Sequence, residues 1–112
     1  MYNFQKWEIW EADVPYREDP LKSSRRPVLI ISPNEVLILK MTTHHHSEKP
    51  KPYEYEIAKW QAAGLTAQTY IQCDCFIKLG QERFSGKQYG RLQMTDIIGV
   101  QYMLQYHGLI TK

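Results

Sequence analysis

The chain has 112 residues, of which 43% are hydrophobic and 23% charged, and this composition excludes an intrinsically disordered protein. Its 14 basic and 12 acidic residues leave a net charge of +2, too small to indicate nucleic-acid binding unless the charges cluster locally. No run approaches the roughly 18 to 20 apolar residues that a membrane-spanning helix needs. The first ten residues also lack the layout of a signal peptide, so we expect one cytoplasmic domain over residues 1–112.

The first half of the sequence predicts three strands. Residues 7–15, WEIWEADVP, are short and aromatic and end at a proline, which is typical of a strand. Residues 16–26 are polar and predict an exposed loop. PVLIIS, residues 27–32, is apolar at consecutive positions, as in a central strand buried on both faces. A proline-containing turn then leads to EVLILKMT, residues 35–42, which predicts an antiparallel hairpin.

The middle of the chain predicts a long loop followed by two short elements. The polar segment 43–54 contains two prolines and predicts a loop, and the alternating segment 53–57 predicts a strand. Residues 58–65 are helix formers interrupted by Gly64, which predicts a short helical turn that ends at this glycine.

The segment QTYIQCDCFIKLG, residues 68–80, is the longest strand candidate. A period of two places Ile71, Cys73, Cys75 and Ile77 on its core face and Tyr70, Gln72, Asp74 and Phe76 on its outward face. The two cysteines would then be about 6.5 to 7 Å apart, at or beyond the usual limit for a disulfide. We therefore expect two reduced thiols without the further ligands that a metal site requires.

The C-terminal part predicts a glycine-bearing loop over residues 80–90 and one amphipathic helix over residues 96–107. Thr95 would cap this helix, Asp96 would complement its positive end, and Gly108 would end it. Its apolar stripe, formed by Ile97, Val100 and Leu104 and broadened by Ile98 and Tyr102, is wide enough to face a partner subunit. Short strands with one late helix predict a mainly β (β-rich α+β) fold, a small curved barrel with a C-terminal helix, with an α+β sheet as the alternative.

The segments WEIWEADVP, RRPVLIIS, ILKMT, AGL, YIQCD and GRLQMTDI, taken in this order, resemble the MazF/PemK (Kid-like) toxin family over roughly residues 7–104. RPVLIIS after a polar loop is the strongest match, and KMT at the end of the next strand is the second. Trp7 stands where the family has a glycine. The resemblance implies an SH3-like barrel, a homodimer, metal-independent cleavage of single-stranded RNA, and restraint by a cognate antitoxin peptide lying in the RNA groove.

The resemblance also implies three site positions. Arg26 matches the arginine before the strand's proline, and Thr42 matches the threonine that ends the next strand, with Thr43 as the register-shifted alternative. Asp74 matches an aspartate of the Kid-like branch, but Gln72 stands where that branch has an arginine. Because this glutamine removes a cation, the chain would rely on Arg26 alone, cleave slowly, or not cleave.

Cleavage of RNA by its own 2′-hydroxyl requires a base, a group that stabilises the extra negative charge, and an acid for the leaving oxygen. Arg26 suits the charged role because a guanidinium binds two phosphate oxygens and stays protonated. Thr42 would donate a hydrogen bond to the phosphate, and Asp74 or His44 would accept the hydroxyl proton. Without the resemblance, these residues would be read as a surface ion pair, an ordinary strand end and a solvated carboxylate.

The three consecutive histidines His44, His45 and His46 lie just after the predicted strand that ends at Thr42. Adjacent histidines in a loop rarely converge on one metal ion without a third type of ligand, so we expect no metal and no cofactor. A plain solvated loop is the interpretation that we favour for this segment.

Basic residues cluster in the predicted loops. They are Arg17, Lys22, Arg25 and Arg26 in the first loop, Lys49 and Lys51 in the second, and Arg83, Lys87 and Arg91 in the third. Tyr16, Tyr53, Tyr55, Phe84 and Tyr89 lie among them and could stack on bases. The residues expected to contact RNA are Arg17, Lys22, Arg25, Thr43, Gln72, Arg83 and Lys87. If the loops do not converge, they are ordinary solvated loops.

These observations support a homodimeric endoribonuclease toxin as the leading hypothesis. The rival hypothesis is a non-catalytic barrel that binds a protein, either an antitoxin tail or a topoisomerase, or that binds nucleic acid. Gln72 is the feature that favours the rival.

Overall fold

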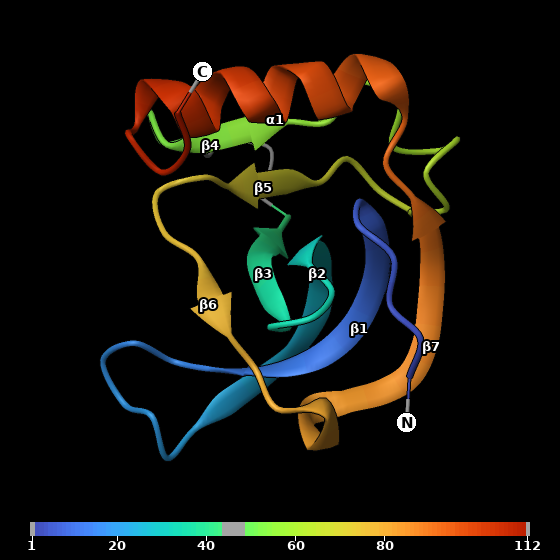
Figure 1. The fold of residues 1–112 in the computed structure, drawn as a ribbon, viewed down its shortest axis with the longest axis vertical. Helices are drawn as coiled ribbons and strands as arrows, with labels where there is room; N and C mark the ends of the chain where they lie inside the picture. The colour runs from blue at the N-terminus through green and yellow to red at the C-terminus, as the bar shows by residue number, and fades with distance from the viewer. Residues whose placement is uncertain (1, 44–48, 112) are drawn as a thin grey trace.

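The computed structural model describes residues 2–43 and 49–111. Its elements are β1 (Glu8–Pro15), β2 (Ser23–Ser32), β3 (Leu37–Thr42), β4 (Glu54–Glu56), β5 (Tyr70–Gln72), β6 (Ile77–Lys78), the 3₁₀ helix η1 (Gln81–Arg83), β7 (Phe84–Arg91) and α1 (Met94–Tyr106). Within these ranges the fold is one antiparallel sheet of seven strands with a single α-helix near the C-terminus (Figure 1).

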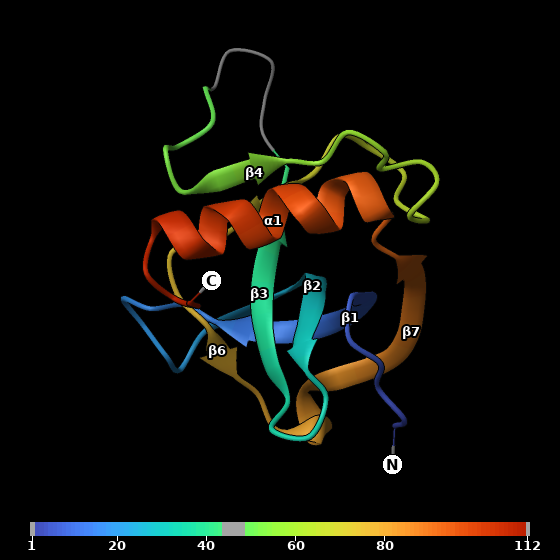
Figure 2. The same cartoon turned by 45° about the horizontal axis from the view of Figure 1, so that its top comes forward.

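The strands form a strongly curved sheet in the order β4-β5-β3-β2-β1-β7, with β6 paired to β3. The strand pairings in the described part of the chain are all antiparallel, including the predicted hairpin of β2 and β3. The sheet is barrel-like but not closed, because in the described part of the chain β4 and β7 are its two ends. Figure 2 shows α1 lying across the top of the curved sheet beside β4. The predicted β-rich fold with a C-terminal helix is confirmed.

The central strands carry apolar side chains on both faces because a separate core lies on each side of the sheet. Leu29 of β2 belongs to a cluster that contains the buried side of α1. Val28 and Ile30 of the same strand belong to a second cluster, which contains Phe4 and Phe84. This arrangement confirms that residues 27–32 form a central strand buried on both faces.

Two segments predicted as loops are strands. Residues 23–26 belong to β2 and continue its pairing with β1 as far as Pro15 and Ser23. Most of the loop expected over residues 80–90 belongs to β7, which pairs with β1 with a register shift between Trp10 and Ala12. Gly86 has a φ of 95° in this irregular stretch, a conformation that favours glycine and suits a bulge. Pairing with a distant strand therefore overrides the polar, turn-like local sequence.

The prediction of one long strand over residues 68–80 is wrong, because this segment forms two short strands, β5 and β6, that both pair with β3. β5 pairs Ile71 with Met41 of β3, whereas β6 pairs Ile77 with Ile38. Five residues (72–76) thus lie opposite only two (39–40). The chain accommodates the excess by bulging outward after β5, and this bulge carries Asp74.

The helix begins earlier than predicted and uses a different N-cap. Gln93 is the N-cap residue of α1, so the predicted capping by Thr95 is wrong. Asp96 is fully buried and accepts three hydrogen bonds, from the Tyr55 hydroxyl and two backbone N–H groups of the following turn. Burial and this carboxylate raise the pKa of Tyr55, which keeps the phenol protonated as a donor. Gly108, at a φ of 76°, ends the helix as predicted.

The buried face of α1 is narrower than predicted. Ile97, Val100 and Leu104 are buried, whereas Ile98 and Tyr102 are 59% and 71% exposed. Whether a partner subunit covers these two side chains stays a prediction. Within the described ranges, no helix is long and apolar enough to cross a bilayer.

Trp7 has a backbone conformation that a glycine would adopt more easily. Its φ is 74°, in the left-handed region. Its N–H donates to Ile30 at 2.8 Å and its carbonyl accepts from Leu92 at 2.9 Å, so it links β2 to the end of β7. This geometry gives a physical reason for a glycine at this position in the resembling family.

The two cysteines are free, as predicted, but they occupy different environments. Cys73 is buried, and burial raises the pKa of its thiol to about 12. Cys75 is partly exposed in the bulge. At pH 8 we therefore expect iodoacetamide to alkylate Cys75 and spare Cys73 in the folded protein, as measured by peptide mass spectrometry. Both cysteines should react in urea, and equal native rates at the two thiols would contradict the placement of Cys73.

Candidate active site

The candidate site lies where β2 and β3 separate. The pairing of β2 with β3 ends at Val28 and Lys40. Beyond it, β2 stays paired with β1, whereas β3 turns to pair with β5 through Thr42 and Tyr70. The gap holds a pocket of about 240 Å³. Its lining residues are Ser24, Arg25, Arg26, Pro27, Met41, Thr42, Thr43 and Thr69.

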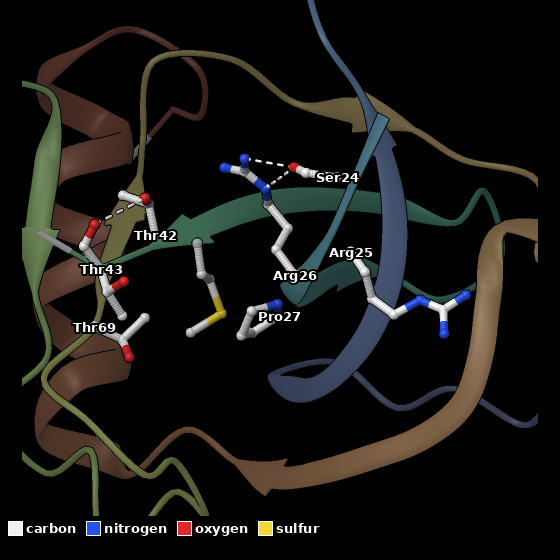
Figure 3. Close-up of a pocket in the computed structure, with 8 residues that line it drawn as sticks. Ser24, Arg25, Arg26, Pro27, Thr42, Thr43 and Thr69 are labelled. Atoms are coloured by element: carbon white, nitrogen blue, oxygen red, sulfur yellow. Dashed lines mark hydrogen bonds between the residues drawn. The ribbon is translucent and has the colours of Figure 1, made fainter. Parts of the chain in front are cut away.

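Arg26 supplies the cation of this pocket. It is half-buried on β2, and its Nε and Nη2 donate to Ser24 Oγ at 2.9 and 2.6 Å. Among the described residues it forms no ion pair with a carboxylate. Arg25 differs, because it is exposed and its Nε lies 3.2 Å from Asp13 Oδ1, an interaction that raises its pKa. Figure 3 shows the two arginines pointing in different directions.

Hydroxyl groups form the opposite wall of the pocket. Thr42, the last residue of β3, donates through Oγ1 to the Thr43 carbonyl at 3.2 Å. Thr69 precedes β5, is almost fully buried, and donates to the Ala67 carbonyl at 2.9 Å. An arginine that faces several hydroxyls can bind a tetrahedral anion such as a phosphate group.

Ser24 and Thr69 line the pocket although sequence reasoning did not select them. The relevant signal for Ser24 is its spacing of two residues from Arg26, which places both side chains on one face of a strand. The signal for Thr69 is weaker, because it depends on the pairing of Tyr70 with Thr42. Arg26 and Thr42, in contrast, were predicted site residues, and the structure brings them to the same pocket.

Asp74 and Gln72 do not line this pocket. The Asp74 carboxylate lies in the bulge after β5, where its Oδ2 is 4.0 Å from Arg17 Nη2. Arg17 Nη2 also contacts Cys75 Sγ at 2.8 Å, so the β1–β2 loop is held against the bulge. Gln72 is half-exposed on β5 opposite Glu54. We expected Asp74 to lie with Arg26 and Thr42 around one pocket, but only Arg26 and Thr42 of these three residues line it.

A second, more apolar pocket of about 430 Å³ lies beside this bulge. Its lining residues are Pro15, Tyr16, Arg17, Pro20, Lys40, Cys75, Phe76, Ile77, Lys78 and Leu79. Lys40 precedes Thr42 by two residues on β3, so both side chains project from the same face of this strand. The pocket thus combines apolar walls with three cationic side chains.

Several predicted RNA contacts lie away from both pockets. Lys22, Arg83 and Lys87 line neither pocket, and Lys87 Nζ lies 4.7 Å from the centre of the Tyr89 ring. Phe84 is buried at 6% exposure, so it is a core residue and not a surface for base stacking.

Two of the candidate tyrosines have partners within the fold. The Tyr55 hydroxyl donates to Asp96 at 2.6 Å, and the Tyr89 hydroxyl donates to Glu11 at 3.1 Å. Burial and the contact with Glu11 raise the pKa of Tyr89. The hydroxyl groups of both tyrosines therefore form hydrogen bonds within the fold.

The predicted histidine candidates His44, His45 and His46 lie outside the described residues. Within residues 2–43 and 49–111, no group of three histidine, cysteine, aspartate or glutamate side chains is arranged to hold a metal ion.

The fold and the sequence identify a class of protein. Residues 5–107 match the family described as "PemK-like, MazF-like toxin of type II toxin-antitoxin system", and the chain belongs to this family. The structure is similar to a solved endoribonuclease in complex with its cognate antitoxin from mycobacterial species. The TM-score is 0.70 at 17% sequence identity, over 97% of this chain and 98% of the other, which shows a shared fold. Sequence comparison with curated proteins gives no significant match.

Proposed function

We propose that this chain is a toxin of the endoribonuclease type that cleaves single-stranded RNA without a metal. The observation that carries the proposal is the pocket between β2 and β3, where Arg26, unpaired with any described carboxylate, faces the hydroxyl of Thr42. The membership of the chain in the MazF-like toxin family and the fold shared with an endoribonuclease support the proposal.

In the proposed reaction, the 2′-hydroxyl of the RNA attacks the adjacent phosphorus. A new bond forms between the 2′-oxygen and phosphorus as the 2′-hydroxyl gives its proton to a general base. The bond to the 5′-oxygen breaks at the same time, and the 5′-oxygen takes up a proton from solvent. The products are a 2′,3′-cyclic phosphate and a 5′-hydroxyl. Arg26 stabilises the negative charge that develops on the phosphate oxygens, and Thr42 orients the phosphate by a hydrogen bond.

The general base has two candidates. Asp74 does not line the pocket, and its carboxylate already lies near Arg17. His44 directly follows the pocket residue Thr43 in the sequence, and an imidazole side chain can accept a proton as a general base. We therefore prefer His44 as the base and assign Asp74 to the positioning of the β1–β2 loop.

The proposed chemistry predicts which RNA substrates the protein cleaves. The purified chain should cleave single-stranded RNA in excess chelator and leave 2′,3′-cyclic phosphate ends, as measured by mass spectrometry of the fragments. The same RNA with 2′-O-methyl groups should resist cleavage, because its attacking hydroxyl is blocked. Cleavage of the methylated RNA, or loss of activity in chelator with recovery on adding zinc, would rule out this mechanism.

A second proposed function is the binding of an acidic antitoxin peptide, and the pocket beside the bulge is the observation that favours it. Arg17, Lys40 and Lys78 are its three cations, and the rest of its lining is mostly apolar. These features suit an apolar side chain flanked by carboxylates. The similar mycobacterial endoribonuclease is in complex with an antitoxin, which supports a partner of this kind.

A homodimer remains part of the proposal, with the exposed Ile98 and Tyr102 of α1 as its candidate contact.

A further inference from the structure

The side chain of Ser24 contacts the cation of the candidate site directly. Its Oγ accepts hydrogen bonds from both Nε and Nη2 of Arg26, at 2.9 and 2.6 Å (Figure 3). The two residues are two apart on β2, so they share a face, while Ser23 and Arg25 project from the other face. The backbone beneath Ser24 is held by the pairing of this residue with Val14 of β1.

We propose that Ser24 is a positioning residue that orients the Arg26 guanidinium for phosphate binding. This proposal rests on the endoribonuclease function proposed above. A guanidinium presents five N–H donors and can hold an anion with either of two edges. Ser24 occupies the edge formed by Nε and Nη2. The remaining edge, formed by Nη1 and the second proton of Nη2, is therefore the one offered to two phosphate oxygens.

The physical benefit is that the guanidinium is ordered before RNA binds. A free arginine side chain samples many rotamers, and the two contacts to Ser24 remove part of that freedom before RNA binds. No carboxylate among the described residues forms an ion pair with Arg26, so the interaction that orders the guanidinium does not neutralise its charge. A hydroxyl therefore orients the cation while leaving its positive charge available to the transition state.

Threonine at position 24 would preserve the hydroxyl oxygen that accepts from Arg26, whereas alanine would remove it.

The first test is steady-state cleavage of single-stranded RNA by Ser24→Ala, Ser24→Thr and Ser23→Ala. We expect Ser24→Ala to lower kcat about 10-fold, since a hydrogen bond to a charged group commonly contributes a factor of ten or more. KM should change less, because the orientation of the cation matters most in the transition state. Ser24→Thr should restore most of the rate. Ser23→Ala is the matched control on the opposite face and should resemble the wild type.

The second test does not depend on activity. In the free protein, the Nε–H resonance of Arg26 should be resolved by ¹⁵N–¹H NMR and should shift and broaden in Ser24→Ala but not in Ser23→Ala. In an Arg26→Ala background, Ser24→Ala should cause no further loss of cleavage, because its effect acts through the guanidinium.

The possible outcomes separate this inference from the proposed function. Loss of cleavage in Arg26→Ala, together with full activity and an unchanged Arg26 resonance in Ser24→Ala, would overturn the role of Ser24 and leave the nuclease proposal intact. Full activity of Arg26→Ala would overturn the nuclease site itself. Failure of Ser24→Thr to recover activity while the Arg26 resonance returns to its wild-type position would also reject the positioning role.

Discussion

Replacing Arg26 with alanine is expected to lower the rate of RNA cleavage about 100- to 1,000-fold, the loss typical of removing one transition-state donor. Arg26 is the only arginine in the pocket lining that the described structure leaves without a carboxylate partner. No neighbouring cation lining the pocket points the same way, because Arg25 is directed elsewhere and is paired with Asp13 (Figure 3). The measurement is single-turnover cleavage of a labelled single-stranded RNA with enzyme in excess.

Two further variants make this test specific. Arg26→Lys keeps the charge but loses the planar fork, so we expect a rate between those of the wild type and Arg26→Ala. Lys59→Ala removes an equal charge from an exposed position that lines neither pocket, and it should cleave like the wild type. An unchanged rate in Arg26→Ala, with folding confirmed by circular dichroism, would remove Arg26 from the site and with it the proposed mechanism.

Part of the site could be predicted from the sequence because it depends on one local hairpin. The apolar run 27–32 identifies a central strand, and the turn after it sets an antiparallel partner. With Val28 opposite Lys40, the residues two positions further along each strand, Arg26 and Thr42, lie on the same face. Their shared pocket thus follows from a short-range register.

The position of Asp74 could not be predicted because it depends on a non-local register. A regular strand through residues 68–80 would have carried Asp74 along the sheet beside Gln72. Instead β5 and β6 both pair with β3 in different registers, and the excess residues bulge toward Arg17. The extension of β2 to Ser23 and the formation of β7 were missed for the same reason, since both depend on pairing with β1.

The role of Asp96 also exceeds what its sequence position indicates. Near the start of a helix, an aspartate is ordinarily an exposed group that interacts with the helix dipole. Here Asp96 has no exposed surface, and its two carboxylate oxygens accept hydrogen bonds from Tyr55, Ala58 and Lys59 at 2.6, 2.8 and 2.9 Å. One side chain therefore joins β4, the turn over residues 58–64 and α1. Gly64, at a φ of 92°, lets this turn pack closely against the backbone of Tyr89 in β7.

Replacing Asp96 with alanine is expected to lower the free energy of unfolding by about 3–5 kcal/mol, because each buried donor left without an acceptor costs about 1–3 kcal/mol. A domain of this size is typically stable by about 5–15 kcal/mol, so the loss should be visible in urea unfolding followed by tryptophan fluorescence. Asp96→Asn keeps one acceptor oxygen and should lose less. Thr95→Ala is the neighbouring control, because Thr95 is exposed and provides no cap, and its effect should stay within about 0.5 kcal/mol. Equal stability of Asp96→Ala and Thr95→Ala would show that the three hydrogen bonds do not hold the helix to the sheet, and the packing of Ile97, Val100 and Leu104 would then be the dominant contact.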